Sequence, residues 1–205
     1  MQRIFLASLF KDVSRLFVDF ANENLVGKTV TFIPTAALPD QLDFHIKYSK
    51  ELLSEMGFVV DELEISTATH LDIVSKLENN DYIYVAGGNT FFLLQEMNRT
   101  GAGNLIKMQI NAGKLFVGES AGAILLSPHI AYSKETDNPL AAPQLNTYEA
   151  LNIIDFYPVS HYKNPPLQEA VDMVISKYGA ELPLVPFSNS QAILIIGKEM
   201  QIVSV

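Results

Sequence analysis

The stretch from Leu115 to Leu126 reads Leu-Phe-Val-Gly-Glu-Ser-Ala-Gly-Ala-Ile-Leu-Leu and sets the expectation for the architecture. Its first three residues form a short apolar run that is typical of a buried strand, and its last four predict a helix. Between them lies a Gly-x-Ser-x-Gly pattern, which forms a nucleophile elbow where it joins a strand to a helix. In such a turn the Ser120 hydroxyl projects beyond the strand, and the Ala121 N–H lies at a helix start.

Upstream of this stretch, short apolar runs alternate with segments of helical periodicity. The predicted strands are 4–7, 30–33, 58–65, 82–86 and 115–117. The predicted helices are 13–21, 42–56, 69–77, 91–97 and 105–110. This alternation predicts an α/β fold whose mostly parallel strands are joined by right-handed crossovers, with helices on both faces. Ligands of such sheets bind beyond the carboxyl ends of the strands.

The helix predicted at 69–77 carries a capping pattern and an apolar face. Thr69 followed by Asp72 resembles a capped helix start. Leu71, Val74 and Leu77 then follow at helical spacing, so we expect them to face the sheet.

Beyond Pro128 the pattern changes. Residues 127–150 lack periodicity, and so long a connection is more often functional or irregular than a linker. A strand is predicted at 153–160, a helix at 165–178, and short strands with turns between 184 and 203. No repeat or second domain is evident, so residues 1–205 are expected to form a single domain.

The composition narrows the class of protein. Apolar residues make up 48% and charged residues 18%, which predicts a globular fold. A net charge of −9 disfavours a nucleic-acid partner. The absence of cysteine excludes disulfides and thiolate chemistry, and no His-Glu-x-x-His pattern occurs, so no metal or cofactor is expected. Without a secretory leader or a span-length apolar run, we expect a cytoplasmic protein with no membrane partner. The sequence does not decide between a monomer and a homodimer.

A serine nucleophile needs a base, and the chain has four histidines. His45, His70 and His129 are expected to be surface or packing residues. His161 differs because it ends a predicted strand, where open α/β sheets place their sites. Its position fits a catalytic base for Ser120 and a structural residue equally well.

The segment Gly87-Gly88-Asn89-Thr90 joins a predicted strand to a predicted helix. Adjacent glycines let backbone N–H groups approach a ligand, so Gly88 could complement Ala121 in an oxyanion hole. The alternative is an ordinary tight turn capped by Asn89 or Thr90.

The partner of the histidine is harder to place. Glu135 and Asp137 lie between the serine and the histidine, in the order Ser, acid, His. Each could equally be a solvated loop carboxylate. Glu119, inside the Gly-x-Ser-x-Gly pattern, is not expected to orient His161.

Three segments together resemble peptidase family S51, the group of aspartyl dipeptidase and cyanophycinase. They are Gly87–Phe91, Gly118–Ala123 and Phe156–Tyr162, and their order and spacing match that family. The resemblance implies a three-layer α/β/α, flavodoxin-like fold related to class I glutamine amidotransferases. It also implies a serine peptidase that cleaves dipeptides with N-terminal aspartate and needs no metal. Ser120 then matches the nucleophile, His161 the base, and Gly88 and Ala121 the oxyanion donors.

Two features depart from that family. The family's acid falls near Glu135 or Asp137. Its alternative glutamate near the C-terminal strands is replaced here by Asn189, whose amide could orient His161 and hold its tautomer but would stabilise the imidazolium less. Recognition of an aspartyl side chain calls for a cation, ideally a guanidinium. The chain's three arginines are Arg3, Arg15 and Arg99, and all precede Ser120. Lys134 or Lys163 could substitute, with Asn89 as a further candidate for substrate binding.

The sequence therefore predicts a serine-type peptidase that hydrolyses small peptides, with dipeptides carrying N-terminal aspartate as the implied substrates. One alternative is a non-catalytic domain that binds or senses a small molecule. Another is a different amide or ester hydrolase on the same scaffold.

Overall fold

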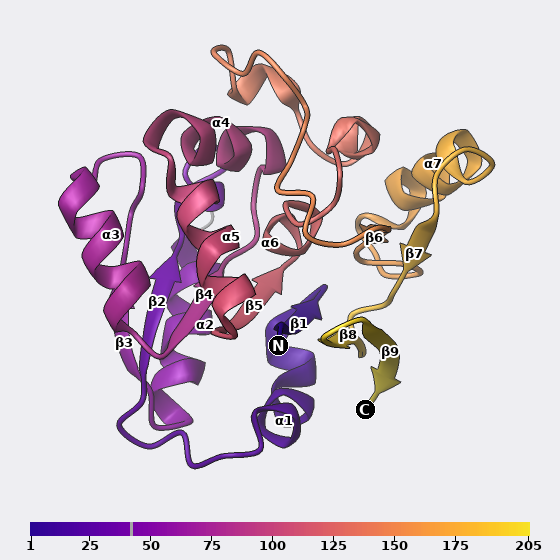
Figure 1. Ribbon diagram of the computed structural model, residues 1–205. Helices are drawn as coiled ribbons and strands as arrows, with labels where there is room; N and C mark the ends of the chain where they lie inside the picture. Colours follow the sequence, from indigo (N-terminus) through magenta and orange to yellow (C-terminus); the bar gives the residue numbers. More distant parts are fainter. Residues whose placement is uncertain (42) are drawn as a thin grey trace.

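The central sheet of the computed structural model, which describes residues 1–41 and 43–205, has seven strands among those residues (Figure 1). In chain order these are β1 (Arg3–Ala7), β2 (Thr29–Ile33), β3 (Val59–Glu62), β4 (Tyr82–Val85), β5 (Leu115–Glu119), β8 (Gln191–Ile196) and β9 (Glu199–Ser204). Across the sheet they lie in the order β3-β2-β4-β5-β1-β8-β9. The first five are parallel, and β8 and β9 add two antiparallel strands. The prediction of a mostly parallel sheet is confirmed.

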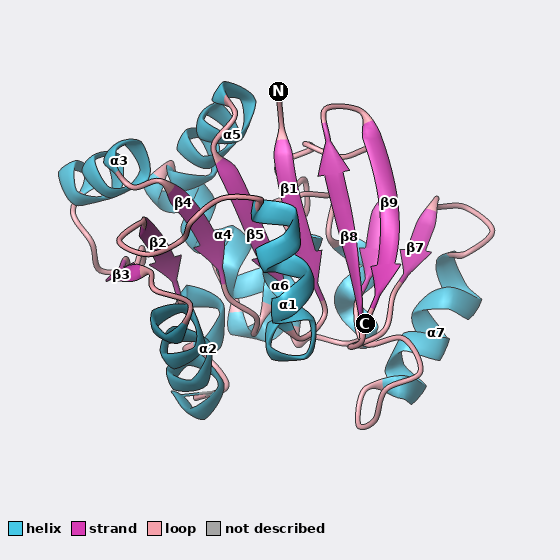
Figure 2. Ribbon diagram, turned by 90° about the horizontal axis from the view of Figure 1, so that it is seen from below, coloured by secondary structure: helices cyan, strands magenta, loops and turns pink. Residues whose placement is uncertain are grey.

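Helices cover both faces of the sheet, which confirms the three-layer α/β/α arrangement. One face carries α1 (Phe10–Ala21) and α2 (Asp43–Glu55), and α1 lies across that face in Figure 2. The other face carries α3 (His70–Asn79), α4 (Thr90–Thr100), α5 (Ala102–Ala112) and the short α6 (Ala121–Ile124). The apolar stripe predicted for the helix at 42–56 begins with Leu42, and Leu42 lies outside the described residues.

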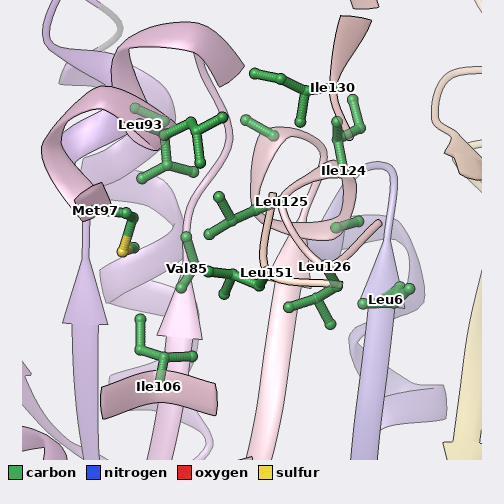
Figure 3. Packing of buried hydrophobic residues seen from close by; sticks show 14 of the residues in the cluster. Leu6, Val85, Leu93, Met97, Ile106, Ile124, Leu125, Leu126, Ile130 and Leu151 are labelled. Atoms are coloured by element: carbon green, nitrogen blue, oxygen red, sulfur yellow. The ribbon is translucent and has the colours of Figure 1, made fainter. Parts of the chain in front are cut away.

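Alternation along each strand divides the core into two clusters. In β1, Phe5 faces α1 and packs edge-on against Phe10 and Phe17, with ring centroids 6.2 and 5.4 Å away. Its neighbour Leu6 faces the opposite cluster, in which Leu6 and Val85 meet side chains from α4, α5 and α6 (Figure 3). Because strand side chains alternate between faces, each strand buries apolar groups on both sides.

The strand order relates the fold to flavodoxin-like sheets. A flavodoxin-like sheet has the order 2-1-3-4-5. The five parallel strands here have the order 3-2-4-5-1. If β2, β3, β4 and β5 are renumbered 1 to 4 and β1 becomes strand 5, this is the flavodoxin-like order. The carboxyl ends of β1, β4 and β5 therefore meet at one edge, where the predicted site segments lie.

The C-terminal part is less regular. Residues 127–150 hold two short 3₁₀ turns, η2 (Ala131–Glu135) and η3 (Pro139–Ala141), as the lack of periodicity indicated. Next come β6 (Tyr157–Val159), α7 (Gln168–Tyr178) and β7 (Leu184–Pro186). β6 and β7 pair with each other in a separate two-stranded sheet and lie with α7 on the side of the main sheet that carries β8 and β9 (Figure 1).

Three sequence predictions need correction. The strand predicted at 153–160 is reduced to β6, because the N–H groups of Ile153 and Ile154 donate to the Leu126 carbonyl and close the segment that follows α6. The strand predicted at 58–65 ends at Glu62, after which the chain turns. In α3 the Thr69 cap and the burial of Leu77 are confirmed, but Leu71 is 79% exposed, and Ile73 faces the core in its place.

No helix in residues 1–41 or 43–205 combines the length and apolar character needed to cross a membrane.

Close backbone packing at Gly122 gives a first testable prediction. A Cβ at Gly122 would lie 2.2 Å from the Val85 carbonyl oxygen, so Gly122→Ala must push α6 away from β4. We expect a loss of at least about 2 kcal/mol in the free energy of unfolding, measured with urea.

Gly27→Ala is the matched control for that variant. Gly27 has φ of +79° but open space around it, so only backbone strain of about 1 kcal/mol is expected. An equal or smaller loss for Gly122→Ala than for Gly27→Ala would contradict the proposed packing.

Candidate active site

The turn from Gly118 to Gly122, called the elbow below, holds Ser120 in an unusual backbone conformation. Ser120 joins β5 to α6 with φ 48° and ψ −105°, a region that costs free energy for a residue with a side chain. The Ser120 N–H donates to the Ala7 carbonyl at the end of β1 (2.8 Å). A Cβ at Gly118 would lie 2.6 Å from the Gly122 carbonyl oxygen, so the two glycines allow the tight turn.

Ser120, His161 and Asn189 form a continuous hydrogen-bonded chain. Ser120 Oγ lies 3.0 Å from His161 Nε2, and His161 Nδ1 lies 2.8 Å from Asn189 Oδ1. Because an amide oxygen only accepts, Nδ1 carries the proton, and the Nε2 lone pair then faces the serine hydroxyl. Such a chain can transfer a proton from the serine to the imidazole.

Ser8, the residue after β1, fixes the histidine loop to the main sheet. The His161 N–H donates to Ser8 Oγ (3.1 Å), and that hydroxyl donates to the Phe187 carbonyl (3.0 Å). Ser8 is almost fully buried, so these bonds are shielded from water. His161 itself has φ of +63°, so the loop holds it, like Ser120, at a positive φ that residues with side chains rarely adopt.

A second contact fixes the loop that carries Asn189. The Asn189 N–H donates to Asn164 Oδ1 (2.8 Å), and the Tyr162 N–H donates to the Phe187 carbonyl (3.1 Å). The segments around 161–164 and 187–189 are thus bound to each other. Sequence reasoning missed Ser8 and Asn164. For Ser8, its place directly after an apolar strand was the available signal.

Burial keeps the imidazole neutral. It lowers the pKa of His161 below its ordinary value, and the hydrogen bond to Asn189 only partly opposes this. Among the described residues no carboxylate is hydrogen-bonded to the ring. A neutral histidine at pH 7 is the form that can accept a proton.

The two predicted oxyanion donors follow two neighbouring strands, β4 and β5. Ala121 is the first residue of α6, and Gly88 follows β4 with φ of +139°. A Cβ at Gly88 would lie 2.2 Å from the Ala36 carbonyl oxygen, so no larger residue fits there. Neither N–H forms a hydrogen bond within the part of the chain that the structure describes, so both are free for a ligand.

The structure does not bring Glu135 or Asp137 to His161, so their prediction as its partner is wrong. Glu135 forms an ion pair with Lys177 (2.6 Å). Asp137 Oδ2 instead accepts a hydrogen bond from the Thr90 N–H at the start of α4 (3.0 Å). The chain order Ser, acid, His is satisfied, but each carboxylate is bound elsewhere, and Asn189, the third candidate partner, is hydrogen-bonded to the ring.

The other candidates for substrate binding have structural contacts. Asn89 is buried, accepts from the Phe92 N–H (3.0 Å) and donates to the Asn138 carbonyl (3.0 Å), so it caps α4 and anchors the loop. Lys163 is exposed, and its Nζ lies 5.0 Å from the Tyr162 ring centroid. The Nζ of Lys134 lies over the ring of Tyr148.

The remaining titratable residues considered in the sequence analysis make their contacts in other parts of the fold. Glu119 points to the α1 side of the sheet, where it accepts from the Phe10 N–H (2.8 Å) and the Tyr84 hydroxyl (2.7 Å). His129 packs on Tyr157 at 4.8 Å between ring centroids. His45 and His70 belong to α2 and α3.

A small pocket of about 30 Å³ lies beside Ser120. Its walls come from the elbow, η2 and the loop after it, β6, the segment before α7, and α7 itself. The residues are Ser120, Ile124, Tyr132, Ser133, Thr136, Asp137, Val159, Ser160, His161, Leu167 and Val174. None of them is a lysine or an arginine. Nowhere in residues 1–41 and 43–205 do three or more His, Asp or Glu side chains cluster as metal ligands.

Fold and site together define an α/β protein in which a Ser120–His161–Asn189 chain lies at the carboxyl edge of a mostly parallel sheet. Residues 5–203 match the peptidase family S51, and the chain belongs to that family. A relative in Listeria monocytogenes, named only as an uncharacterized peptidase, is 48% identical over 200 residues, which span 98% of this chain and 97% of that protein. The Peptidase E of Shigella flexneri is 32% identical over 145 residues, 69% of this chain and 59% of its own.

Solved structures agree with this assignment. A crystal structure from Listeria monocytogenes EGD-e, provisionally described as a peptidase E protein, superposes with a TM-score of 0.95 at 47% identity and covers 100% of this chain and 99% of that one. A peptidase from an acI-B1 Actinobacterium has the same fold, with a TM-score of 0.70 at 19% identity, 100% of this chain and 88% of that chain being covered.

The contact between His161 and Asn189 gives a second prediction. Replacing the amide by a carboxylate, Asn189→Asp, places a negative charge against Nδ1 and stabilises the imidazolium. We expect the pKa of His161 to rise, as read from the titration of its ring proton by NMR and assigned by its loss in His161→Gln.

Ser190→Asp is the control, because it adds the same charge one residue away at an exposed position. Asp137, whose pKa burial raises to about 6, titrates in the same range but is common to all these proteins. If Asn189→Asp moved the pKa of His161 no further than Ser190→Asp does, the direct contact would be refuted.

Proposed function

We propose that this protein is a serine-type peptidase that hydrolyses small peptides, with Ser120 as nucleophile and His161 as base. The observation that carries the proposal is the hydrogen-bonded chain from Ser120 through His161 to Asn189, at the end of a strand and beside two free N–H groups. Membership of a peptidase family supports the same reaction class.

The geometry supports a two-step mechanism. His161 Nε2 accepts the Ser120 proton as Oγ attacks the scissile carbonyl, and the N–H groups of Gly88 and Ala121 stabilise the oxyanion. His161 then donates that proton to the leaving amine, which gives an acyl-enzyme ester on Ser120. Water, deprotonated by His161, attacks the ester and releases the acid.

Asn189 acts as a positioning residue in this mechanism. Its amide oxygen holds the tautomer in which Nε2 faces Ser120, as the asparagine of Cys-His-Asn proteases does. An amide stabilises the imidazolium less than a carboxylate, and burial of His161 disfavours that charged form as well. The proposal therefore relies on Asn189 for the tautomer and orientation of the ring and not for its charge.

The residues that line the pocket argue against recognition of an N-terminal aspartyl side chain. An aspartyl side chain would need a cation, yet neither lysine nor arginine lines the pocket, and the carboxylate of Asp137 does. We propose small peptides, including dipeptides, as substrates, and we expect no preference for N-terminal aspartate.

A third prediction tests the nucleophile. Ser120→Ala should abolish both dipeptide hydrolysis and covalent labelling by a fluorophosphonate probe, because only Oγ can form the phosphonyl ester. The measurements are release of free amino acid and in-gel fluorescence of the purified protein. Ser190→Ala, an exposed serine near the His161–Asn189 contact, should keep both.

The same measurements separate the alternatives. Unchanged hydrolysis in Ser120→Ala would refute the proposed nucleophile. Absence of labelling in the unmodified protein would favour a non-catalytic domain that binds a small molecule. Labelling together with turnover of esters but not peptides would indicate a different hydrolase on the same scaffold.

A further inference from the structure

Glu119 lies directly before Ser120, and the proposed mechanism gives its carboxyl group no role. The residue is 8% exposed and lies on the α1 side of the sheet, where Tyr84 stacks on Phe32 at 5.1 Å between ring centroids. Burial raises the pKa of Glu119, although hydrogen bonds from the Phe10 N–H and the Tyr84 hydroxyl oppose that rise. Burying a carboxyl group among apolar side chains is costly, which indicates that its contacts serve the fold or the site.

The contact with Phe10 caps α1 from a neighbouring strand. Glu119 Oε1 accepts from the N–H of Phe10, the first residue of α1 (2.8 Å). Leu9, which precedes the helix, has a side chain that cannot accept a hydrogen bond. A serine, threonine, aspartate or asparagine at that position would cap the helix locally. The cap comes instead from the residue before Ser120, so it connects the start of α1 to the elbow.

The segment Ala7–Phe10, called the β1–α1 turn below, is therefore bound to the elbow at both ends. At one end the Ser120 N–H donates to the Ala7 carbonyl (2.8 Å), and at the other the Phe10 N–H donates to Glu119. Ala7 and Glu119 are also direct partners in the register of β1 and β5. Two successive residues of the Gly-x-Ser-x-Gly pattern thus fix both ends of this turn.

Ser8 lies between those two ends and carries the histidine loop. Its Oγ accepts from the His161 N–H (3.1 Å) and donates to the Phe187 carbonyl (3.0 Å). A displaced β1–α1 turn would move this attachment point relative to Ser120, whose Oγ lies 3.0 Å from His161 Nε2. Misplacement of reacting groups by about 1 Å can lower a rate about 100-fold.

We propose that Glu119 is a positioning residue, which fixes the β1–α1 turn through the Phe10 N–H and thereby sets, through Ser8, the distance between Ser120 and His161. This rests on the proposed function. Glu119 contacts neither the substrate nor the reacting atoms. Its carboxyl group links the strand that ends at the nucleophile with the loop that carries the base.

The test compares two replacements of Glu119 that fill the same space. Glu119→Gln keeps an oxygen that accepts from the Phe10 N–H, and the Tyr84 hydroxyl can accept from its amide group. Glu119→Leu has no acceptor. We expect Glu119→Leu to lower kcat for alanyl-alanine, and the rate of fluorophosphonate labelling at Ser120, by at least about tenfold. KM should change by less than about twofold, because Glu119 does not contact the substrate. Glu119→Gln should lower both rates by less than about threefold.

A double-mutant cycle tests the route through Ser8. Ser8→Ala removes the hydroxyl to which the His161 N–H donates. If Glu119 acts through that hydroxyl, Glu119→Leu added to Ser8→Ala should lower the labelling rate by less than about threefold, because the effects of coupled residues do not add. A further loss as large as that in the otherwise unmodified protein would contradict the route.

Glu96→Leu is the matched control. Glu96 is 4% exposed and lies on α4, where its carboxylate accepts from Gln95 and Arg99. Its replacement should lower the free energy of unfolding, measured with urea, without changing kcat or the labelling rate at a temperature at which all variants are folded. If Glu119→Leu does not fold, Glu119→Asp carries the same expectation, because its shorter side chain withdraws the carboxylate from the Phe10 N–H.

NMR adds a measurement that does not depend on turnover. The ring-proton signals of His161, assigned by their loss in His161→Gln, should shift in Glu119→Leu and stay in place in Glu119→Gln and Glu96→Leu. In a labelled protein, unchanged rates in Glu119→Leu, equal losses in Glu119→Gln and Glu119→Leu, or an equal loss in Glu96→Leu would overturn the role of Glu119 alone. An unmodified protein that is not labelled would overturn the proposed function and that role with it, whatever the ring signals show.

Discussion

Close backbone contact around the elbow is the constraint on which the site depends. The Gly122 backbone lies against the Val85 carbonyl, which leaves no room for a Cβ, and the Ser120 N–H is bonded to Ala7. These contacts join β1, β4 and β5 at one edge and hold Ser120 in its strained conformation with positive φ. Favourable packing elsewhere in the fold offsets the free-energy cost of that conformation.

The loops that carry His161 and Asn189 are attached to this edge through the hydroxyl of Ser8. Ser8 lies at the end of β1, accepts from the His161 N–H and donates to the Phe187 carbonyl. It therefore aligns the histidine loop and the asparagine loop with the strand beside Ser120. The result is a hydrogen-bonded chain in which burial favours the neutral histidine and the third member is an amide, while Asp137 accepts from the Thr90 N–H instead of contacting the ring.

Much of this was accessible from the sequence, because periodicity and strand-to-helix turns are local signals. The parallel sheet, the elbow, Gly88 and the Thr69 cap follow from such signals. For the partner of His161 the sequence offered three candidates, Glu135, Asp137 and Asn189, and could not choose Asn189 among them, since that choice depends on contacts between distant segments. Glu135 and Asp137 satisfied the expected chain order, but Lys177 and Thr90 bind them elsewhere. The run at 153–160 had the composition of a strand, yet Ile153 and Ile154 bond to the segment after α6.

The central claim is that Ser120 becomes covalently acylated during turnover. Its most direct test is mass spectrometry of the protein quenched in acid during hydrolysis of an alanyl ester, followed by peptide mapping. The account predicts a mass increase of one alanyl group on the fragment that contains Ser120, absent in Ser120→Ala. Turnover without an adduct in either protein, or an adduct on another residue, would contradict it.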